Sequence, residues 1–192
     1  MLKFIYGVMG SSKSAQALIT EYNYSHNKYN VLLLKSSIDT RDNVVKSRIG
    51  LSKECIIFNP NTDLLYIYDI FKKSENINKD YKNIIIVDEA QFCTKEQIEE
   101  LQYLSQYIDV LCYGLLTNFK TELFEGSKRL IEIADSCEQI HHICNCGKQA
   151  TINALFEGSK LVTEGNEIHI GDTEYQAMCY TCWSTLNKLK ES

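Results

Sequence analysis

Two segments of the chain constrain its fold most, because each is an apolar run that ends in polar residues. Residues 3–14 (KFIYGVMGSSKS) lead into a loop of small residues closed by Lys-Ser, and residues 84–89 (IIIVDE) end in two carboxylates. The backbone N–H groups of such a loop can surround phosphate oxygens, and its lysine places an ammonium on them. One carboxylate can hold Mg²⁺ while the other takes a proton. Together the segments predict a nucleotide-phosphate site.

The loop follows the pattern G-x-x-x-x-G-K-[ST] from Gly7 to Ser14 except at Ser12, which stands where the pattern has glycine. Glycine tolerates positive φ and lets the backbone approach a ligand closely. If this position needs a left-handed conformation, Ser12 costs about 1–2 kcal/mol. We expect the small residues Gly10 and Ser11 to compensate in part. The loop alone would also fit an ordinary Gly/Ser turn before a helix, and the acidic pair favours the phosphate site.

Composition excludes several classes of protein. A chain of 192 residues fits one domain with a small addition. Its net charge of −5 argues against a large nucleic-acid surface. No apolar run approaches about 18 residues, so no membrane span is expected. Gly, Ser and Lys interrupt the N-terminus where a signal peptide would be apolar. We therefore expect a cytoplasmic protein with no nucleic acid and no membrane as a partner, and eight reduced cysteines.

Apolar runs alternate with helical patterns along the chain. Strands are expected at Leu2–Tyr6, 31–34, Ile56–Phe58, 84–87, 110–115 and 140–142. Helices are expected at 14–24, 64–71, after the capping box of Thr94 and Gln97, and at 126–134. The polar stretch 35–53 is expected to be a loop. This alternation predicts a mostly parallel sheet covered on both faces, with ligands at the carboxyl ends of its strands.

Half of the cysteines form two close pairs. We call Cys144, Cys146, Cys179 and Cys182 the cysteine cluster. Two thiolate pairs brought together give a tetrahedral zinc site. The segment that holds them is short and interrupted by glycine, so we expect a metal rather than a core of its own to stabilise it. His141 and His142 are near enough to be alternative ligands. Small buried hydrophobes are expected at Cys55, Cys93, Cys112 and Cys137.

In order, these residues resemble the type II thymidine kinases, which have a P-loop domain and a zinc-bearing lasso domain. The matching segments are residues 7–14, 39–41 (DTR), 47–51 (SRIGL), 88–92 (DEAQF), 111–119 (LCYGLLTNF) and 124–127 (FEGS), with the cysteine cluster and Tyr175. The departures are Ser12, Leu116, Asn118 and Asn153, the last standing where some members have threonine at the base. The resemblance implies an α/β, RecA-like P-loop kinase domain at residues 1–140 and a zinc-binding lasso domain at residues 141–192.

The resemblance implies an activity, the transfer of the γ-phosphate of ATP to the 5′-hydroxyl of thymidine or deoxyuridine in deoxynucleotide salvage. It assigns Glu89 as the base for that hydroxyl and Arg41 as a group that stabilises charge on the transferred phosphate. The nucleotide and its phosphates would contact Gly7, Met9, Gly10, Ser11, Ser12, Lys13, Ser14, Asp88, Glu89 and Gln91. Ser14 and Asp88 would hold the Mg²⁺ that accompanies ATP.

The resemblance also implies where the nucleoside lies. It would contact Met9, Phe92, Leu115, Phe119 and Tyr175, beneath a lasso of residues 154–176. Zinc in the cysteine cluster would be structural and would anchor this lasso, because four cysteines leave no open position for catalysis. A homotetramer and feedback binding of thymidine triphosphate are further expectations from the family.

Two other classes of function fit part of these motifs. Residues 88–91 (DEAQ) are similar to motif II of DEAD/DEAH-type helicases, which would make the chain a nucleic-acid-stimulated P-loop ATPase with a zinc knuckle. Its length argues against this alternative, since helicases need two such domains, and so does its acidic balance. A non-catalytic P-loop regulator with a decayed loop is the third alternative. The presence of Lys13, Ser14, Asp88 and Glu89 argues against it.

Overall fold

The computed structural model describes residues 1–38, 42–165 and 174–191. Within these residues the main body is a six-stranded sheet in the order β5-β2-β6-β7-β1-β8, and each neighbouring pair is parallel. Its strands are β1 (Leu2–Tyr6), β2 (Tyr29–Ser36), β5 (Ile56–Phe58), β6 (Lys82–Asp88), β7 (Asp109–Gly114) and β8 (Ser136–Gln139). Because all neighbours are parallel, their carboxyl ends meet at one edge of the sheet.

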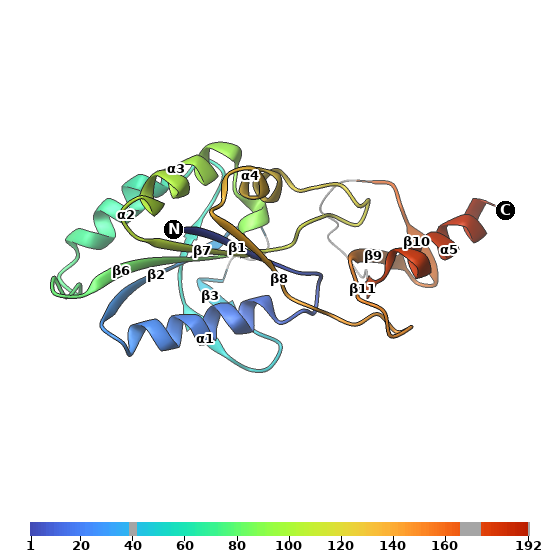
Figure 1. Cartoon of the computed structure of the whole chain (residues 1–192), viewed down its shortest axis with the longest axis horizontal. Helices are drawn as coiled ribbons and strands as arrows, with labels where there is room; N and C mark the ends of the chain where they lie inside the picture. The colour runs from blue at the N-terminus through green and yellow to red at the C-terminus, as the bar shows by residue number, and fades with distance from the viewer. Residues whose placement is uncertain (39–41, 166–173, 192) are drawn as a thin grey trace.

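Helices cover both faces of this sheet (Figure 1). Helix α1 (Lys13–Ser25) lies on one face. On the other face lie α2 (Leu64–Lys73), α3 (Lys95–Ser105) and α4 (Glu125–Ile133). A single 3-10 turn, η1 (Ala90–Phe92), follows β6. The predicted fold class, a mostly parallel α/β sheet, is confirmed.

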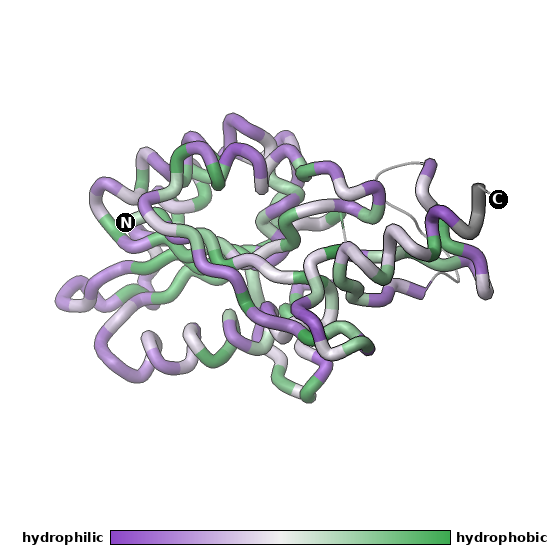
Figure 2. Tube along the Cα trace, turned by 45° about the vertical axis from the view of Figure 1, so that its right-hand side comes forward, coloured by the Kyte–Doolittle hydropathy of each residue, from purple (hydrophilic) through white to green (hydrophobic). Residues whose placement is uncertain are grey.

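Burial on both faces explains why the central strands are apolar throughout. In β6, Ile84 and Ile86 pack in the cluster that includes Ala17 of α1. Ile85 and Val87 point to the opposite face, in the cluster that includes Leu101 of α3. Successive strand residues face opposite sides, so a strand covered twice needs apolar residues at every position. Figure 2 shows the same distribution, with apolar colour along the central strands and polar colour on outer helical turns.

A smaller unit extends from the carboxyl edge of the main sheet, at the right of Figure 1. It is an antiparallel sheet in the order β10-β9-β11, followed by α5 (Tyr180–Glu191). Its strands are β9 (Ile152–Glu157), β10 (Lys160–Val162) and β11 (Glu174–Met178). Contrary to expectation, this unit has a small apolar cluster, in which Ala154, Leu161 and Met178 pack with Val8 from the loop after β1. It completes its core with a residue of the main body.

Several predicted elements are confirmed, and two are wrong. Strands β1 and β5 have the predicted bounds, and the capping box is present, since Thr94 and Gln97 exchange hydrogen bonds of 3.1 and 3.2 Å. The stretch 35–53 is not all loop, because it holds the hairpin strand β3 (Val44–Lys46) and most of β4 (Ser52–Glu54). The last strand of the main sheet is β8, not 140–142. β8 is a polar edge strand, so its sequence lacks the apolar signal.

The cysteines outside the cluster differ from one another in burial. Cys93 and Cys112 are buried as predicted, and burial raises the pKa of both thiols. Cys55 is only half-buried. The prediction for Cys137 is wrong, because this residue is exposed on the edge strand β8. Across the described parts of the chain, no helix has the length and apolar character needed to cross a lipid bilayer.

Candidate functional site

The loop Gly7–Ser14 and the carboxylate pair Asp88-Glu89 meet at one pocket. It has a volume of about 370 Å³ and lies at the carboxyl ends of β1, β6 and β7. It is lined by eleven of the predicted site residues: Met9, Gly10, Ser12, Lys13, Ser14, Glu89, Gln91, Phe92, Leu115, Phe119 and Tyr175. Gly7, Ser11 and Asp88 lie in the same loop and strand, behind this lining. Arg41 lies outside the described residues, as do the lasso positions 166–173.

The loop between β1 and α1 adopts the conformation that its glycine pattern predicts. Ser12 has φ 65° and ψ 23°, which is left-handed backbone, so the expected cost of about 1–2 kcal/mol applies. A Cβ at Gly7 would lie 2.4 Å from Oγ of Ser11 and 3.1 Å from the carbonyl oxygen of Ile140, so a larger residue there would displace the buried Ser11 side chain. The loop then leads into the first turn of α1, whose N-terminus favours an anion.

Charged groups gather at this end of the pocket. The Lys13 ammonium donates to the carbonyl oxygen of Val8 at 2.8 Å. Burial lowers the pKa of Lys13, and the nearby carboxylates of Glu89 and Asp88 oppose that shift. Asp88 is buried, and burial raises its pKa, while a hydrogen bond from the Ser14 hydroxyl opposes the rise. A hydroxyl beside a carboxylate is a ligand pair that suits Mg²⁺.

Glu89 is held by its own backbone and by Gln91. Glu89 has φ 56°, a second left-handed position without glycine at the site. Nε2 of Gln91 donates to Oε2 of Glu89 at 2.5 Å, and Oε1 of Gln91 accepts from the N–H of Leu115 at 3.0 Å. The side chain of Gln91 is 2% exposed. A buried amide therefore ties the carboxylate after β6 to the backbone after β7.

Aromatic and aliphatic side chains also line the pocket, among them Phe92, Leu115 and Phe119. The Phe119 side chain is 1% exposed, and Phe92 packs edge-on against Phe124 with ring centroids 5.7 Å apart. The hydroxyl of Ser127 donates to the carbonyl oxygen of Leu115 and fixes that wall. A Cβ at Gly126 would lie 2.6 Å from the carbonyl oxygen of Ala90, so α4 can pack this closely on η1 only with glycine. The segment 124–127 thus supports the pocket from behind.

The structure adds pocket residues that sequence reasoning did not assign to the site. They are Ala15, Lys46, Ser47, Arg48, Ile49, Thr117, Asn118 and Phe124, and the pocket is also lined by Asn153, which the resemblance had placed at the base. Arg48 comes from the turn between β3 and β4, and a Cβ built at Gly10 would lie 3.7 Å from its Nη1 and 3.7 Å from the His142 ring. The segments 47–51, 111–119 and 124–127 carry the family resemblance, and that signal could have marked Arg48, Thr117 and Phe124. The burial of Asn153 had no sequence signal.

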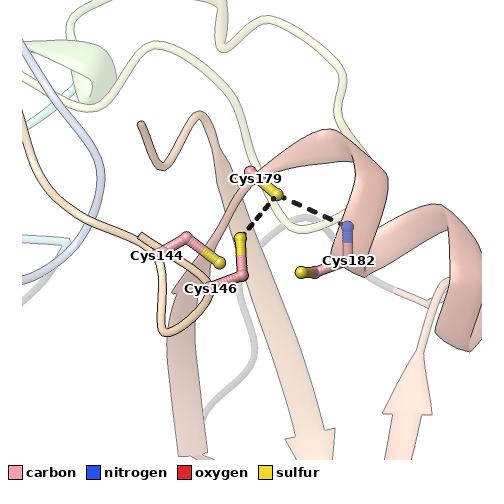
Figure 3. Close-up of side chains that lie close together, drawn as sticks. All are labelled: Cys144, Cys146, Cys179 and Cys182. Atoms are coloured by element: carbon pink, nitrogen blue, oxygen red, sulfur yellow. Dashed lines mark hydrogen bonds between the residues drawn. The ribbon is translucent and has the colours of Figure 1, made fainter. Parts of the chain in front are cut away.

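The cysteine cluster lies in the smaller unit, away from this pocket. All four Sγ atoms lie within 4.8 Å of one another, and those of Cys146 and Cys179 are 3.6 Å apart (Figure 3). A tetrahedral zinc with Zn–S bonds of about 2.3 Å would separate its sulfurs by about 3.8 Å. Cys144 and Cys146 share a tight turn closed by the N–H of Gly147 on the carbonyl oxygen of Cys144 at 2.8 Å. This turn explains how a pair with one intervening residue can serve the cluster.

Hydrogen bonds from main-chain N–H groups lower the pKa of two thiols in the cluster and so favour their thiolate forms. Those of Cys146 and Cys179 lower the pKa of Cys144 to about 6. The N–H of Cys182, in the first turn of α5, lowers the pKa of Cys179. Hydrogen bonds with the neighbouring sulfurs of Cys146 and Cys179 raise the pKa of Cys182 to about 12. Crowded thiols of this kind lose their protons to a bound cation, so the cluster is compatible with a metal site. Neither His141 nor His142 belongs to it among the described residues.

Fold and site together define a P-loop phosphotransferase of the α/β class, in which a phosphate loop, a metal-type aspartate and a second carboxylate meet at an apolar pocket. The sequence model of the family described as thymidine kinase matches residues 1–183 of the chain. The chain belongs to the thymidine kinase family.

Individual relatives agree with the family match. The chain is 42% identical to the thymidine kinase of Enterobacteria phage T4 in an alignment of 192 positions, and this alignment covers 97% of each protein. It is 41% identical to the thymidine kinase of Zymomonas mobilis and 38% identical to that of Haemophilus influenzae, over 184 residues in each case. Those alignments cover 93% of the chain and 93% of each relative.

Proposed function

We propose that the protein transfers the γ-phosphate of ATP to the 5′-hydroxyl of thymidine or deoxyuridine. The observation that carries this proposal is that one pocket is lined both by the charged side chains of Lys13 and Glu89 and by the aromatic side chains of Phe119 and Tyr175. A nucleoside needs flat apolar walls and few polar contacts, whereas a triphosphate needs cations and backbone donors. The pocket offers both within reach of one carboxylate, Glu89.

Phosphoryl transfer depends on position and charge neutralisation, and each residue has a role in these terms. Glu89 accepts the proton of the 5′-hydroxyl, and Gln91 orients its carboxylate. Lys13 places its ammonium on the phosphates. Met9, Phe92, Leu115, Phe119 and Tyr175 form the walls around the base and sugar. Arg48 supplies a further cation above the loop, a role that the sequence assigned only to Arg41.

The loop itself indicates which N–H groups bind phosphate. The N–H of Gly7 donates to the carbonyl oxygen of Gly114 at 3.3 Å, and that of Ser11 donates to Val8 at 3.2 Å. The N–H of Met9 donates to Oδ1 of Asn153 at 2.8 Å. These three donors are engaged inside the protein. Among the other N–H groups of the loop, we assign phosphate binding to that of Gly10 and to those that lead into α1, the N–H groups of Ser12, Lys13 and Ser14.

Two metals complete the proposal. Cys144, Cys146, Cys179 and Cys182 would hold a zinc ion, which would supply the positive charge that four thiolates need and so stabilise the turn after Ile143 against the start of α5. The Ser14 hydroxyl and the Asp88 carboxylate are the side chains that would hold the Mg²⁺ of bound ATP. When bound, Mg²⁺ neutralises charge on the phosphates.

A phosphorylation assay with four acceptors tests the function. Thymidine and deoxyuridine should yield monophosphates with ATP and Mg²⁺, while deoxycytidine and water should react far more slowly. ATP hydrolysis that RNA or DNA stimulates, with no transfer to thymidine, would favour the ATPase alternative instead. Failure to bind ATP at all would favour the non-catalytic regulator.

We also propose a domain boundary and an assembly for the protein. The change from the parallel sheet, which ends at Gln139, to the smaller unit supports domains at residues 1–140 and 141–192. A homotetramer and feedback binding of thymidine triphosphate follow from the family resemblance, and light scattering and competition binding would test them. The cytoplasmic location also stays a prediction.

A further inference from the structure

One buried amide connects the two ends of the pocket. Asn153, on β9 of the smaller unit, is 2% exposed and lies in the pocket wall. Its Oδ1 accepts from the N–H of Met9 at 2.8 Å, and its Nδ2 donates to the carbonyl oxygen of Thr117 at 2.8 Å. A single side chain therefore joins the phosphate loop after β1, the segment after β7 and the small sheet.

The chemistry of its partners fixes the orientation of this amide. A backbone N–H can only donate and a carbonyl can only accept, so the oxygen of Asn153 must face Met9 and its nitrogen must face Thr117. A carboxylate could keep only the first contact, and one short hydroxyl could not span both. Both the oxygen and an N–H of the Asn153 amide are hydrogen-bonded to main-chain groups. The side chain therefore holds the segments of Met9 and Thr117 together and is not mainly a polar contact to a base.

A second contact joins the same parts. The Val8 side chain, next to Met9 in the loop, is 5% exposed and packs in the apolar cluster of the smaller unit. On the other side, β9 pairs with β11, where Tyr175 lies opposite Leu155 and reaches the pocket. Thus the small sheet holds the phosphate loop through Val8 and Met9, and it contributes Tyr175 to the nucleoside end.

We propose that Asn153 is a positioning residue that couples nucleoside binding to the conformation of the phosphate loop. The coupling rests on the proposed function, because it takes the two ends of the pocket as nucleoside and phosphate sites. A nucleoside that contacts Tyr175 stabilises the position of the small sheet. Through Asn153 it then holds Met9, and with it the loop whose remaining N–H groups receive the phosphates. Thymidine and ATP should therefore tighten each other's binding, because coupling between sites is reciprocal.

Calorimetric titration tests the coupling. The zinc-loaded protein is titrated with AMP-PNP and Mg²⁺, with and without thymidine, for the parent, Asn153→Ala and Asn30→Ala. Asn30 is a matched control, since its buried amide also bridges main-chain groups, those of Asn78 at 2.9 and 3.1 Å. In the parent and Asn30→Ala, thymidine should tighten AMP-PNP binding by about fivefold or more. In Asn153→Ala the factor should fall close to one. Equal factors in all three proteins, or no coupling in the parent, would overturn the proposal.

Amide hydrogen exchange gives a readout that needs no activity, so it separates this proposal from failure of the proposed function. Labelling methionine with ¹⁵N reports the amides of Met9 and Met178. Without ligands, Met9 should exchange about tenfold faster in Asn153→Ala, the factor for loss of one typical hydrogen bond. Met178, in β11, should be unchanged and reports that the unit is folded. Unchanged exchange at Met9 would overturn the assignment.

Two further variants sharpen the test. Asn153→Asp keeps an acceptor for Met9 and should retain most of the coupling, although its carboxylate faces the Thr117 carbonyl oxygen. If it loses coupling as completely as Asn153→Ala, the contact to Met9 is not the link. Should the alanine variant fail to fold, Asn153→Val replaces it, because valine suits a strand and offers no acceptor to the N–H of Met9. The same faster exchange at Met9 is then expected, and slow exchange there would contradict the proposal.

Discussion

The amide nitrogen of Gln91 donates a hydrogen bond of 2.5 Å to the carboxylate of Glu89, two residues earlier in the chain. The contact spans the left-handed residue after β6 and the 3-10 turn η1. The amide oxygen of Gln91 is fixed by the N–H of Leu115, so its nitrogen must point toward Glu89. The carboxylate that we propose as the base is thus oriented by a buried neighbour rather than by solvent.

We predict that removal of the base or of its support affects turnover to different degrees. Glu89→Gln should lower kcat by about 10²–10⁴-fold while ATP still binds, because the general base is lost. Gln91→Leu should lower kcat by about tenfold and change KM little, because only one orienting hydrogen bond is lost. Steady-state kinetics measures both.

Gln97→Leu is the control for these variants, since Gln97 is another buried amide, 2% exposed, that holds the loop of Asn59 and Thr62. It should lower stability and leave kcat unchanged. A Glu89→Gln enzyme within threefold of the parent rate would rule out Glu89 as the base.

We predict one zinc per chain in the cysteine cluster. Cys182→Ser should reduce the zinc content well below one, since serine is a poor zinc ligand, and should make the smaller unit easier to cleave by protease. Cys137→Ser is the matched control, because Cys137 is exposed on β8 outside the cluster and its loss should not change the metal content. Metal analysis of the purified proteins decides the matter, and full zinc in Cys182→Ser would exclude the four-thiolate site.

Replacement of Ser12 by glycine should stabilise the phosphate loop. Ser12 has φ 65°, and its side chain makes no hydrogen bond that caps α1, so Ser12→Gly removes strain without loss of a cap. We expect the free energy of unfolding to rise by about 1 kcal/mol and ATP binding to tighten by up to about tenfold.

Denaturant unfolding and calorimetry measure the two effects. Ser52→Gly, at an exposed position of the strand β4, is the control. It should lower the free energy of unfolding, because extended backbone gives glycine no advantage there. Weaker ATP binding by Ser12→Gly would mean that the serine hydroxyl contributes to the site.

We predict that Arg48 contributes to binding of the triphosphate. Arg48→Ala should raise the KM for ATP by about tenfold or more, as loss of a hydrogen bond to a charged group does, and Arg48→Lys should recover part of the loss. Arg129→Ala is the control, since Arg129 on α4 pairs with Glu99 and Glu132 and lies outside the pocket. An unchanged KM in Arg48→Ala would place this arginine outside the site.

The sequence by itself determined the elements whose signals are local. The apolar runs of β1 and β6 reveal strands because both faces of each are buried, and Thr94 with Gln97 reveals a helix start through bonds within one turn. The loop from Gly7 to Ser14 and the pair Asp88-Glu89 predicted where phosphates and metal would lie, since the carboxyl ends of parallel strands meet at one edge. The spacing of the cysteines predicted their cluster for a similar reason, as two short pairs suffice to bring four sulfurs together.

Only the tertiary structure decided the contacts made between distant segments. The resemblance placed Asn153 at the base, but only folding places its amide between Met9 and Thr117. Arg48 looks like a solvated arginine until the β3–β4 turn approaches Gly10. Strand β8 is polar because it is an edge, so its parallel pairing with β1 leaves no apolar trace. Local sequence patterns reflect burial and turn geometry within a few residues. The contacts between distant segments depend instead on how whole helices and strands pack, which only the complete fold determines.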